Sequence, residues 1–364
     1  MHIRKPRKKI TNFKFQVNGR ELQIVNEYKY LGFWLNEHLN YELSSKKLAE
    51  GGSRALGSLI SKFKNIKNVS FNTFTKLYNS GVASVIDNSS EIWGYCKADE
   101  CERIQYRAIR YFLGVHKFCP IPALTGDMGW PSCRERRFKS MIRFWNRLVK
   151  LSDNRLTKKV FLWDLEQKES GNWSCEIESI MDMCNMLGTF ENKTICPLDN
   201  LSKSLNSITE EAWVEKCNAL PKLRSYRQYK TSYETEPYVK MFLSKFERSL
   251  IAQLRSGILP LKLETGRFRN VKDAVTGRYR KLKIEERISE LCKTGVEDEM
   301  HFICLCPVYS TTRNKLYEDV SNVIHNFIEM DDFDKFSLIV SQQCKLLSTH
   351  ITDMWNTRKR LLYN

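Results

Sequence analysis

Three cysteines and a histidine stand within fifteen residues of one another in the segment ERISELCKTGVEDEMHFICLCP, residues 286–307. Thiolate and imidazole are the ligands that zinc prefers in proteins. Cys304 and Cys306 flank a single residue, so in extended backbone both thiols point to one face. The segment predicts either a structural zinc site or a stretch of thiols held by neighbouring hydrophobic residues. The candidate ligands are Cys292, His301, Cys304 and Cys306.

A catalytic metal is not expected in this segment, because nothing nearby supplies an activated water together with a general base. The other histidines are scattered along the chain and do not accompany a serine or cysteine in a recognisable nucleophile motif. The residue types are therefore those of a structural metal site or of a knuckle that no longer holds metal, and not of a catalytic centre.

The charge of the chain points to a different activity. Its net charge is +17, from 59 Lys and Arg against 42 acids. The basic side chains lie in blocks: seven with no acid in 1–20, eleven with three acids in 101–150, and sixteen with five acids in 221–284. Residues 164–215 reverse the sign, with eleven acids and three lysines. Such blocks are typical of surfaces that meet a polyanion, although solvated helix faces would also produce them.

Arginine and lysine neutralise phosphates, so the basic blocks predict contacts to RNA or DNA that are largely independent of sequence. The candidate residues fall on two expected helices and in one basic, loop-rich segment. They are Arg103, Arg107, Arg110, Arg136, Arg143, Arg147, Arg267, Arg269, Arg278, Arg280 and Lys281.

The elements that position these residues are expected to be mainly α-helical, with a small N-terminal β-hairpin element (α+β overall). Phe13, Phe15 and Val17 alternate with polar residues, and Asn18-Gly19 is a strong two-residue hairpin turn. Another extended piece is expected at YKYLGFWL. Apolar periodicity predicts helices from about residue 43, over 71–86, 98–113 and 132–151, and from 242 to about 257. The segment EGGSRALG, 50–57, predicts a close helix contact.

No run of the sequence approaches eighteen apolar residues, so no transmembrane helix and no membrane partner are expected. The basic N-terminus lacks the apolar stretch of a signal peptide. Twelve cysteines without such a signal indicate a reducing compartment. The expected location is nuclear or cytoplasmic, and RKPRKK at 4–9 would suit a nuclear localisation signal or an arm that contacts phosphates.

Five blocks of the chain resemble, in order, the C-terminal part of reverse transcriptases from non-LTR (LINE-type, jockey-like) retrotransposons. The blocks are FKFQVNGRELQIVNEYKYLGFWLN, LYNSGVASVIDNSSEIWGY, ALTGDMGWPSCRERRFKSMIRFWNRL, LRSGILPLKLETGRF and DEMHFICLCPVYSTTR. The resemblance implies a palm end with a primer-grip-like hairpin at 1–36 and a helical thumb and connector at 37–163. It then implies a basic C-terminal module at 216–364 with a degenerate zinc knuckle at 286–313. Between these parts, the weak apolar periodicity of 164–215 predicts an irregular, acidic linker with short helices.

The resemblance also implies what the chain does. The parent enzyme is an RNA-directed DNA polymerase that uses Mg²⁺ held by palm aspartates. Those aspartates would precede residue 1, so this chain is expected to bind RNA or DNA without polymerising nucleotides. Asp331-Asp332 lies past the knuckle without flanking strands and is expected to be a helix-start or loop acid pair. The alternative is a domesticated, non-enzymatic nucleic-acid-binding protein derived from such an element.

The family's knuckle has the pattern Cys-x2-Cys, then His, then Cys five positions further on. The matching positions here are Ser289, Cys292, His301 and Cys306, so a serine stands where the first cysteine is expected. A hydroxyl is a poor zinc ligand. Either Cys304 supplies the fourth ligand, or the knuckle no longer holds metal.

Overall fold

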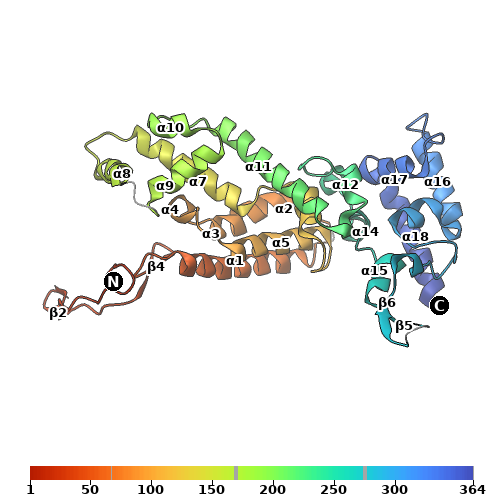
Figure 1. The fold of residues 1–364 in the computed structure, drawn as a ribbon, viewed down its shortest axis with the longest axis horizontal. Coiled ribbons are helices and arrows are strands. Elements are labelled where there is room, and N and C mark those ends of the chain that lie inside the picture. Colours follow the sequence, from red (N-terminus) through yellow and green to blue (C-terminus); the bar gives the residue numbers. More distant parts are fainter. Residues whose placement is uncertain (67, 168–170, 274–276, 364) are drawn as a thin grey trace. The chain divides into compact units, whose positions relative to one another are not determined.

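The computed structural model describes residues 1–66, 68–167, 171–273 and 277–363. Within these ranges the chain is mainly helical, with three small antiparallel pairs of strands, which confirms the expected fold class (Figure 1). The chain divides into two compact units, each built from separated segments. Unit 1 contains 1–62, 76–107 and 131–209, and unit 2 contains 63–75, 108–130 and 210–364.

The elements of the first half of the chain are β1 (Gln16–Val17), β2 (Arg20–Glu21), β3 (Glu27–Tyr30), β4 (Phe33–Asn36), α1 (Glu42–Phe63), α2 (Phe71–Tyr78), the π-helical turn η1 (Asn79–Ala83), α3 (Ser84–Ile86), α4 (Ser90–Trp93), α5 (Asp99–Leu113), α6 (Ile121–Met128), α7 (Cys133–Lys150) and α8 (Leu156–Gln167).

The elements of the second half are α9 (Trp173–Met183), α10 (Leu187–Glu191), α11 (Leu198–Asn218), η2 (Pro221–Leu223), α12 (Tyr226–Tyr229), α13 (Pro237–Lys240), α14 (Lys245–Arg255), α15 (Lys262–Thr265), η3 (Gly266–Phe268), β5 (Asn270–Lys272), β6 (Tyr279–Lys281), η4 (Ile284–Glu286), the π-helical turn η5 (His301–Leu305), η6 (Pro307–Tyr309), α16 (Ser310–Ser321), α17 (Asp332–Ser341) and α18 (Cys344–Tyr363).

Two hairpins form the N-terminal β element. In the first, Val17 pairs with Arg20 across Asn18 and Gly19, whose φ angles are 49° and 77°. Positive φ at both turn residues is what Asn-Gly favours, so the predicted hairpin is confirmed. The piece YKYLGFWL, expected as one extended segment, is a second hairpin in which β3 pairs with β4 across Leu31-Gly32.

In unit 1, α1 passes very close to α3. A Cβ atom added to Gly52 would overlap the Ile86 side chain, and one added to Gly51 would lie 3.2 Å from Val85. Only glycine allows this approach, which confirms the close helix contact expected at 50–57.

Residues 171–209 lie in unit 1 and contribute to its core, so they do not form the irregular linker that the sequence suggested. Side chains of α9 and α11 join those of α7 and α8 in one buried cluster. Trp145 of α7 is fully buried, stacks on Phe190 at 5.3 Å, and donates to the Thr194 carbonyl oxygen at 3.0 Å. The acidic character of the segment lies outside this cluster, as at exposed Asp182.

In unit 2, the C-terminal helix α18 is contacted by α13, α14, α16 and α17 (Figure 1). α14 begins with a capping box of Ser244 and Glu247, and the chain turns away at Gly257, whose φ is 65°. The predicted helix ending near residue 257 is confirmed. Within the described ranges, no helix combines the length and apolar character needed to cross a membrane.

Candidate metal centre and basic surfaces

A tight loop and a π-helical turn form the candidate knuckle. Ile288 bridges to Val296, the Ser289 N–H donates to the Gly295 carbonyl oxygen at 2.9 Å, and Lys293 has a φ of 63°. After this loop, η5 carries the chain from His301 back to Cys306, whose N–H donates to the His301 carbonyl oxygen at 2.8 Å. The loop therefore presents Cys292 toward the two ends of η5.

Three of the four predicted ligands come together. One ligand atom each from Cys292, His301 and Cys306 lies within 4.8 Å of the others, and Cys292 Sγ is 3.2 Å from His301 Nε2. Zinc bonds of about 2.1–2.3 Å at tetrahedral angles separate ligand atoms by about 3.5–3.8 Å, so this cluster could hold a metal ion after small shifts. His301 and Cys306 are buried, while Cys292 is partly exposed.

Cys304 does not join this cluster. Its buried thiol faces the Tyr317 side chain of α16. The sequence expectation assumed extended backbone from Cys304 to Cys306, but residues 301–305 are helical and only Cys306 is extended. The two thiols therefore do not share a face.

The two clustered thiols differ in acidity. Burial opposes ionisation of Cys292, but hydrogen bonds from Ser289, Thr294 and His301 outweigh it and lower the pKa of this thiol to about 6. Burial raises the pKa of Cys306 to about 11, and the neighbouring Cys292 sulfur adds to the effect. A bound cation would favour both thiolates, so metal binding is expected to release the Cys306 proton.

A buried ion pair holds the knuckle loop to the C-terminal helix. The Glu297 carboxylate accepts from Arg358 of α18 at 2.5 and 2.9 Å, and from the Lys262 backbone N–H at 2.7 Å. Both charged side chains are buried. Phe302 packs edge-on against Tyr309 at 4.9 Å on the same module. These contacts fix the loop independently of any metal.

The predicted arginines of α5 have different environments. Arg103 and Arg107 are exposed and lie one turn apart; Arg107 donates to the Ser53 hydroxyl at 2.9 Å. Arg110 is half-buried, and its Nε atom has no partner in the described part of the chain. The exposed end of this helix face is therefore Arg103 and Arg107.

On α7, Arg143 and Arg147 are exposed one turn apart and form no ion pair with any described residue. Arg136 of the same helix is engaged internally. Its guanidinium lies 2.7 Å from the Asp87 carboxylate and also bonds to Gln105 and to the Pro131 carbonyl oxygen. Because these contacts use its donors inside unit 1, we leave Arg136 out of the residues predicted to contact phosphates.

The basic segment of unit 2 is a short hairpin of β5 and β6. The Arg280 guanidinium forms ion pairs with the carboxylates of Asp273 at 3.0 Å and Glu286 at 2.6 Å. The second ion pair connects the hairpin to η4. Arg267 and Arg269 pair with acids at 3.1 and 3.6 Å but remain exposed. Arg278 and Lys281 are exposed as well. Of the predicted basic residues of this segment, these four are exposed, and Arg280 is not.

Asp331 caps a helix, as the sequence suggested for this acid pair. Its side chain accepts from the Asp334 N–H at 2.8 Å at the start of α17. An N-cap of this kind satisfies a free backbone donor. The expectation of a helix-start acid pair is confirmed.

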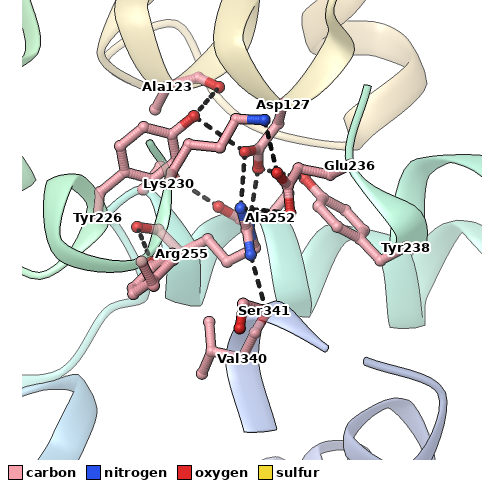
Figure 2. A network of polar contacts seen from close by, with 12 residues as sticks. Ala123, Asp127, Tyr226, Lys230, Glu236, Tyr238, Ala252, Arg255, Val340 and Ser341 are labelled. Atoms are coloured by element: carbon pink, nitrogen blue, oxygen red, sulfur yellow. Dashed lines mark hydrogen bonds and ion pairs between the residues drawn. The ribbon is translucent and has the colours of Figure 1, made fainter. Parts of the chain in front are cut away.

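Sequence reasoning did not find the buried network around Asp127 in unit 2, shown in Figure 2. The Asp127 carboxylate accepts from the Tyr226 and Tyr238 hydroxyls at 3.0 and 2.7 Å, and from Arg255 at 3.0 and 3.1 Å. Arg255 also pairs with Glu236 at 2.8 Å and donates to the Val340 carbonyl oxygen. The only sequence signal was that Asp127 belongs to one of the five recurrent blocks. Because all four bonds to this carboxylate come from the protein, the network joins elements together.

Comparison with protein-family models, with curated proteins and with solved structures gives no match for this chain. The family resemblance therefore stays a prediction.

Proposed function

We propose that this chain binds RNA and DNA through phosphate contacts, as the C-terminal part of a retrotransposon RNA-directed DNA polymerase. The observation that carries the proposal is the pair of exposed, turn-spaced arginines on each of two helices, Arg103 and Arg107 on α5 and Arg143 and Arg147 on α7. Exposed arginines without carboxylate partners are free to neutralise phosphates and to release condensed counterions. The order of the five sequence blocks supports the family assignment.

Binding is expected to occur without chemistry. The adjacent acids Asp331 and Asp332 lie at a helix start, where Asp331 is occupied as an N-cap. Two-metal catalysis needs carboxylates that converge on two cations about 4 Å apart. Primer extension on an RNA template with Mg²⁺ should therefore give no product. Product that disappears on changing Asp331 and Asp332 to Asn would contradict this part of the proposal.

The binding claim is tested by fluorescence anisotropy over a salt series with duplex and single-stranded probes. Changing Arg103 and Arg107, or Arg143 and Arg147, to Glu should weaken binding to all sequences alike. For each phosphate that a variant no longer neutralises, the slope of log K against log salt should flatten by about 0.9 for duplex DNA. Wild-type binding that is absent, or that does not change with salt, would refute the claim.

The matched control for these variants is Lys203→Glu with Lys216→Glu on α11. Both lysines are exposed, and the pair changes the net charge by the same amount in an acidic stretch of the chain. The control should bind as the wild type does. If it loses as much affinity as the arginine variants, net charge alone explains the binding and the proposed helix faces are wrong.

The Cys292–His301–Cys306 cluster is proposed to hold one structural zinc. Support comes from the convergence of two thiols and one imidazole and from the burial of two of the three ligands. Metal analysis of the purified protein should find about one zinc per chain. Cys292→Ser should release it and make residues 286–313 more sensitive to proteolysis, whereas Cys304→Ser should retain it. Protein that contains no stoichiometric zinc would refute this assignment.

The same properties would suit a domesticated nucleic-acid-binding protein in the nucleus or cytoplasm. Both candidates share the binding surfaces, and they differ only in whether a polymerase palm is encoded in frame with this chain. Sequencing the transcript that encodes it distinguishes them.

A further inference from the structure

The cluster that could hold zinc offers only three strong ligands, while structural zinc sites have four. We propose that this centre holds Zn²⁺ through Cys292, His301 and Cys306 and leaves its fourth coordination position to an exchangeable small ligand beside Ser289. The inference rests on the zinc site proposed above. It concerns the one position at which this chain departs from the knuckle pattern.

Ser289 occupies the fourth-ligand position of the knuckle pattern, and its side chain contacts one of the three clustered ligands. Its hydroxyl hydrogen-bonds to the Cys292 sulfur and also accepts from the Cys292 N–H at 3.5 Å. The side chain is 1% exposed, and its oxygen lies 3.4 Å from the Glu297 carboxylate. The loop therefore directs residue 289 toward the cluster, but provides a neutral hydroxyl in place of a thiolate. A neutral hydroxyl binds zinc weakly.

The neighbouring side chains that could replace it are engaged elsewhere. Cys304 faces Tyr317 of α16 and is not part of the cluster. The Glu297 carboxylate is held by Arg358 and the Lys262 N–H, and Asp298 accepts from the His301 N–H at 2.8 Å. The fourth position consequently goes to a ligand from outside the chain.

Solvent can reach the cluster on the side of Cys292, whereas Ser289 itself is buried. Cys292 is partly exposed, and the next two residues, Lys293 and Thr294, are exposed. Three protein ligands with one open, reachable position are the arrangement of zinc sites that exchange ligands. The class of ligand that fits is a small neutral or anionic nitrogen or sulfur donor, with water in its absence.

The test uses the full chain loaded with Co²⁺, whose visible absorption reports on the ligand set of a tetrahedral site. Added imidazole should shift the absorption bands in a saturable manner in the wild type and in Ser289→Ala. In Ser289→Cys a third thiolate closes the site, so imidazole should have no effect, and Zn²⁺ should bind at least about ten-fold more tightly in competition with a chelator. Circular dichroism checks that each variant folds.

The possible failures are distinguishable. No uptake of Co²⁺ or Zn²⁺ by the wild type overturns the zinc proposal itself. If Co²⁺ binds but its absorption bands do not change when imidazole is added, only the proposal of an open fourth position is overturned. In that case, a spectrum changed by Ser289→Ala identifies the serine oxygen as the ligand, and one changed by Cys304→Ser identifies the Cys304 thiol.

Discussion

Replacing Asp127 with Asn should loosen unit 2 at the segment that carries α6. The carboxylate accepts four hydrogen bonds, two at each oxygen, and it is 2% exposed. An amide presents one nitrogen that cannot accept, so two of the four donors lose their partner and Arg255 loses one of its two compensating charges. Removing one partner of a buried ion pair costs about 3–5 kcal/mol. Glu236 remains beside Arg255 and keeps the expected cost at the lower end of this range, about 3 kcal/mol.

Amide hydrogen exchange measures this loss locally. A loss of about 3 kcal/mol corresponds to roughly a hundred-fold faster exchange wherever opening of this region controls the rate. The expected change falls on peptides covering 121–129, where the Gly129 N–H donates to the Thr125 carbonyl oxygen at 2.8 Å. Peptides covering 141–149 in unit 1 should not change and provide an internal control.

The matched substitution is Asp153→Asn, which removes the same charge at an exposed position. It should leave exchange in both regions within about two-fold of the wild type, because surface changes seldom exceed about 0.5 kcal/mol. If Asp127→Asn accelerates exchange in 121–129 by less than about five-fold, or no more than Asp153→Asn does, the network does not stabilise unit 2 as argued.

Two further predictions concern unit 1 and the metal-free knuckle. Gly52→Ala should lower the thermal midpoint by an amount equivalent to about 1–3 kcal/mol, because the new methyl group overlaps Ile86. The control is Gly188→Ala on α10, where the methyl group meets open space and should not destabilise the protein. Equal losses of thermal stability in calorimetry would contradict the close contact. In metal-free protein, the rate of Cys292 alkylation should increase as the pH rises through about 6, because its pKa is about 6 and the thiolate is the reactive form. Cys304 and Cys306 have pKa values of about 11 and should react little below about pH 8. Mass spectrometry of the alkylated peptides checks this, and a Cys292 rate that increases only above about pH 8 would refute it.

Local signals in the sequence predicted the elements that they control directly. Asn18-Gly19 specifies a turn from two residues, and Gly114, with a φ of 73°, ends α5 where it was expected. At the start of α7, the Ser132 side chain accepts from the Glu135 N–H at 3.0 Å. The packing of residues 171–209 into unit 1 was not predicted because their core contacts are distant in sequence, as between Trp145 and Thr194. Short helices with such contacts show weak periodicity.

The candidate site was predictable to a similar extent. The convergence of Cys292, His301 and Cys306 follows from a spacing that the resemblance provided, whereas the direction of Cys304 depends on a π-helical turn that no residue pattern indicates. Arg136 shares the spacing of the exposed arginines on α7. Its guanidinium instead pairs with Asp87, 49 residues earlier, and that contact within unit 1 could not be predicted from spacing alone.

The distance along the chain between Asp127 and Arg255 also determines when unit 2 can form during synthesis. The two residues are separated by 128 positions. At a translation rate of about 5–20 residues per second, Asp127 is added to the chain about 6–26 seconds before Arg255. Throughout that interval, the apolar residues of α6 have no completed core to enter, and the carboxylate has no counterion. We therefore expect nascent unit 2 to expose apolar segments that chaperones bind, and to be the part of this protein in which folding intermediates form.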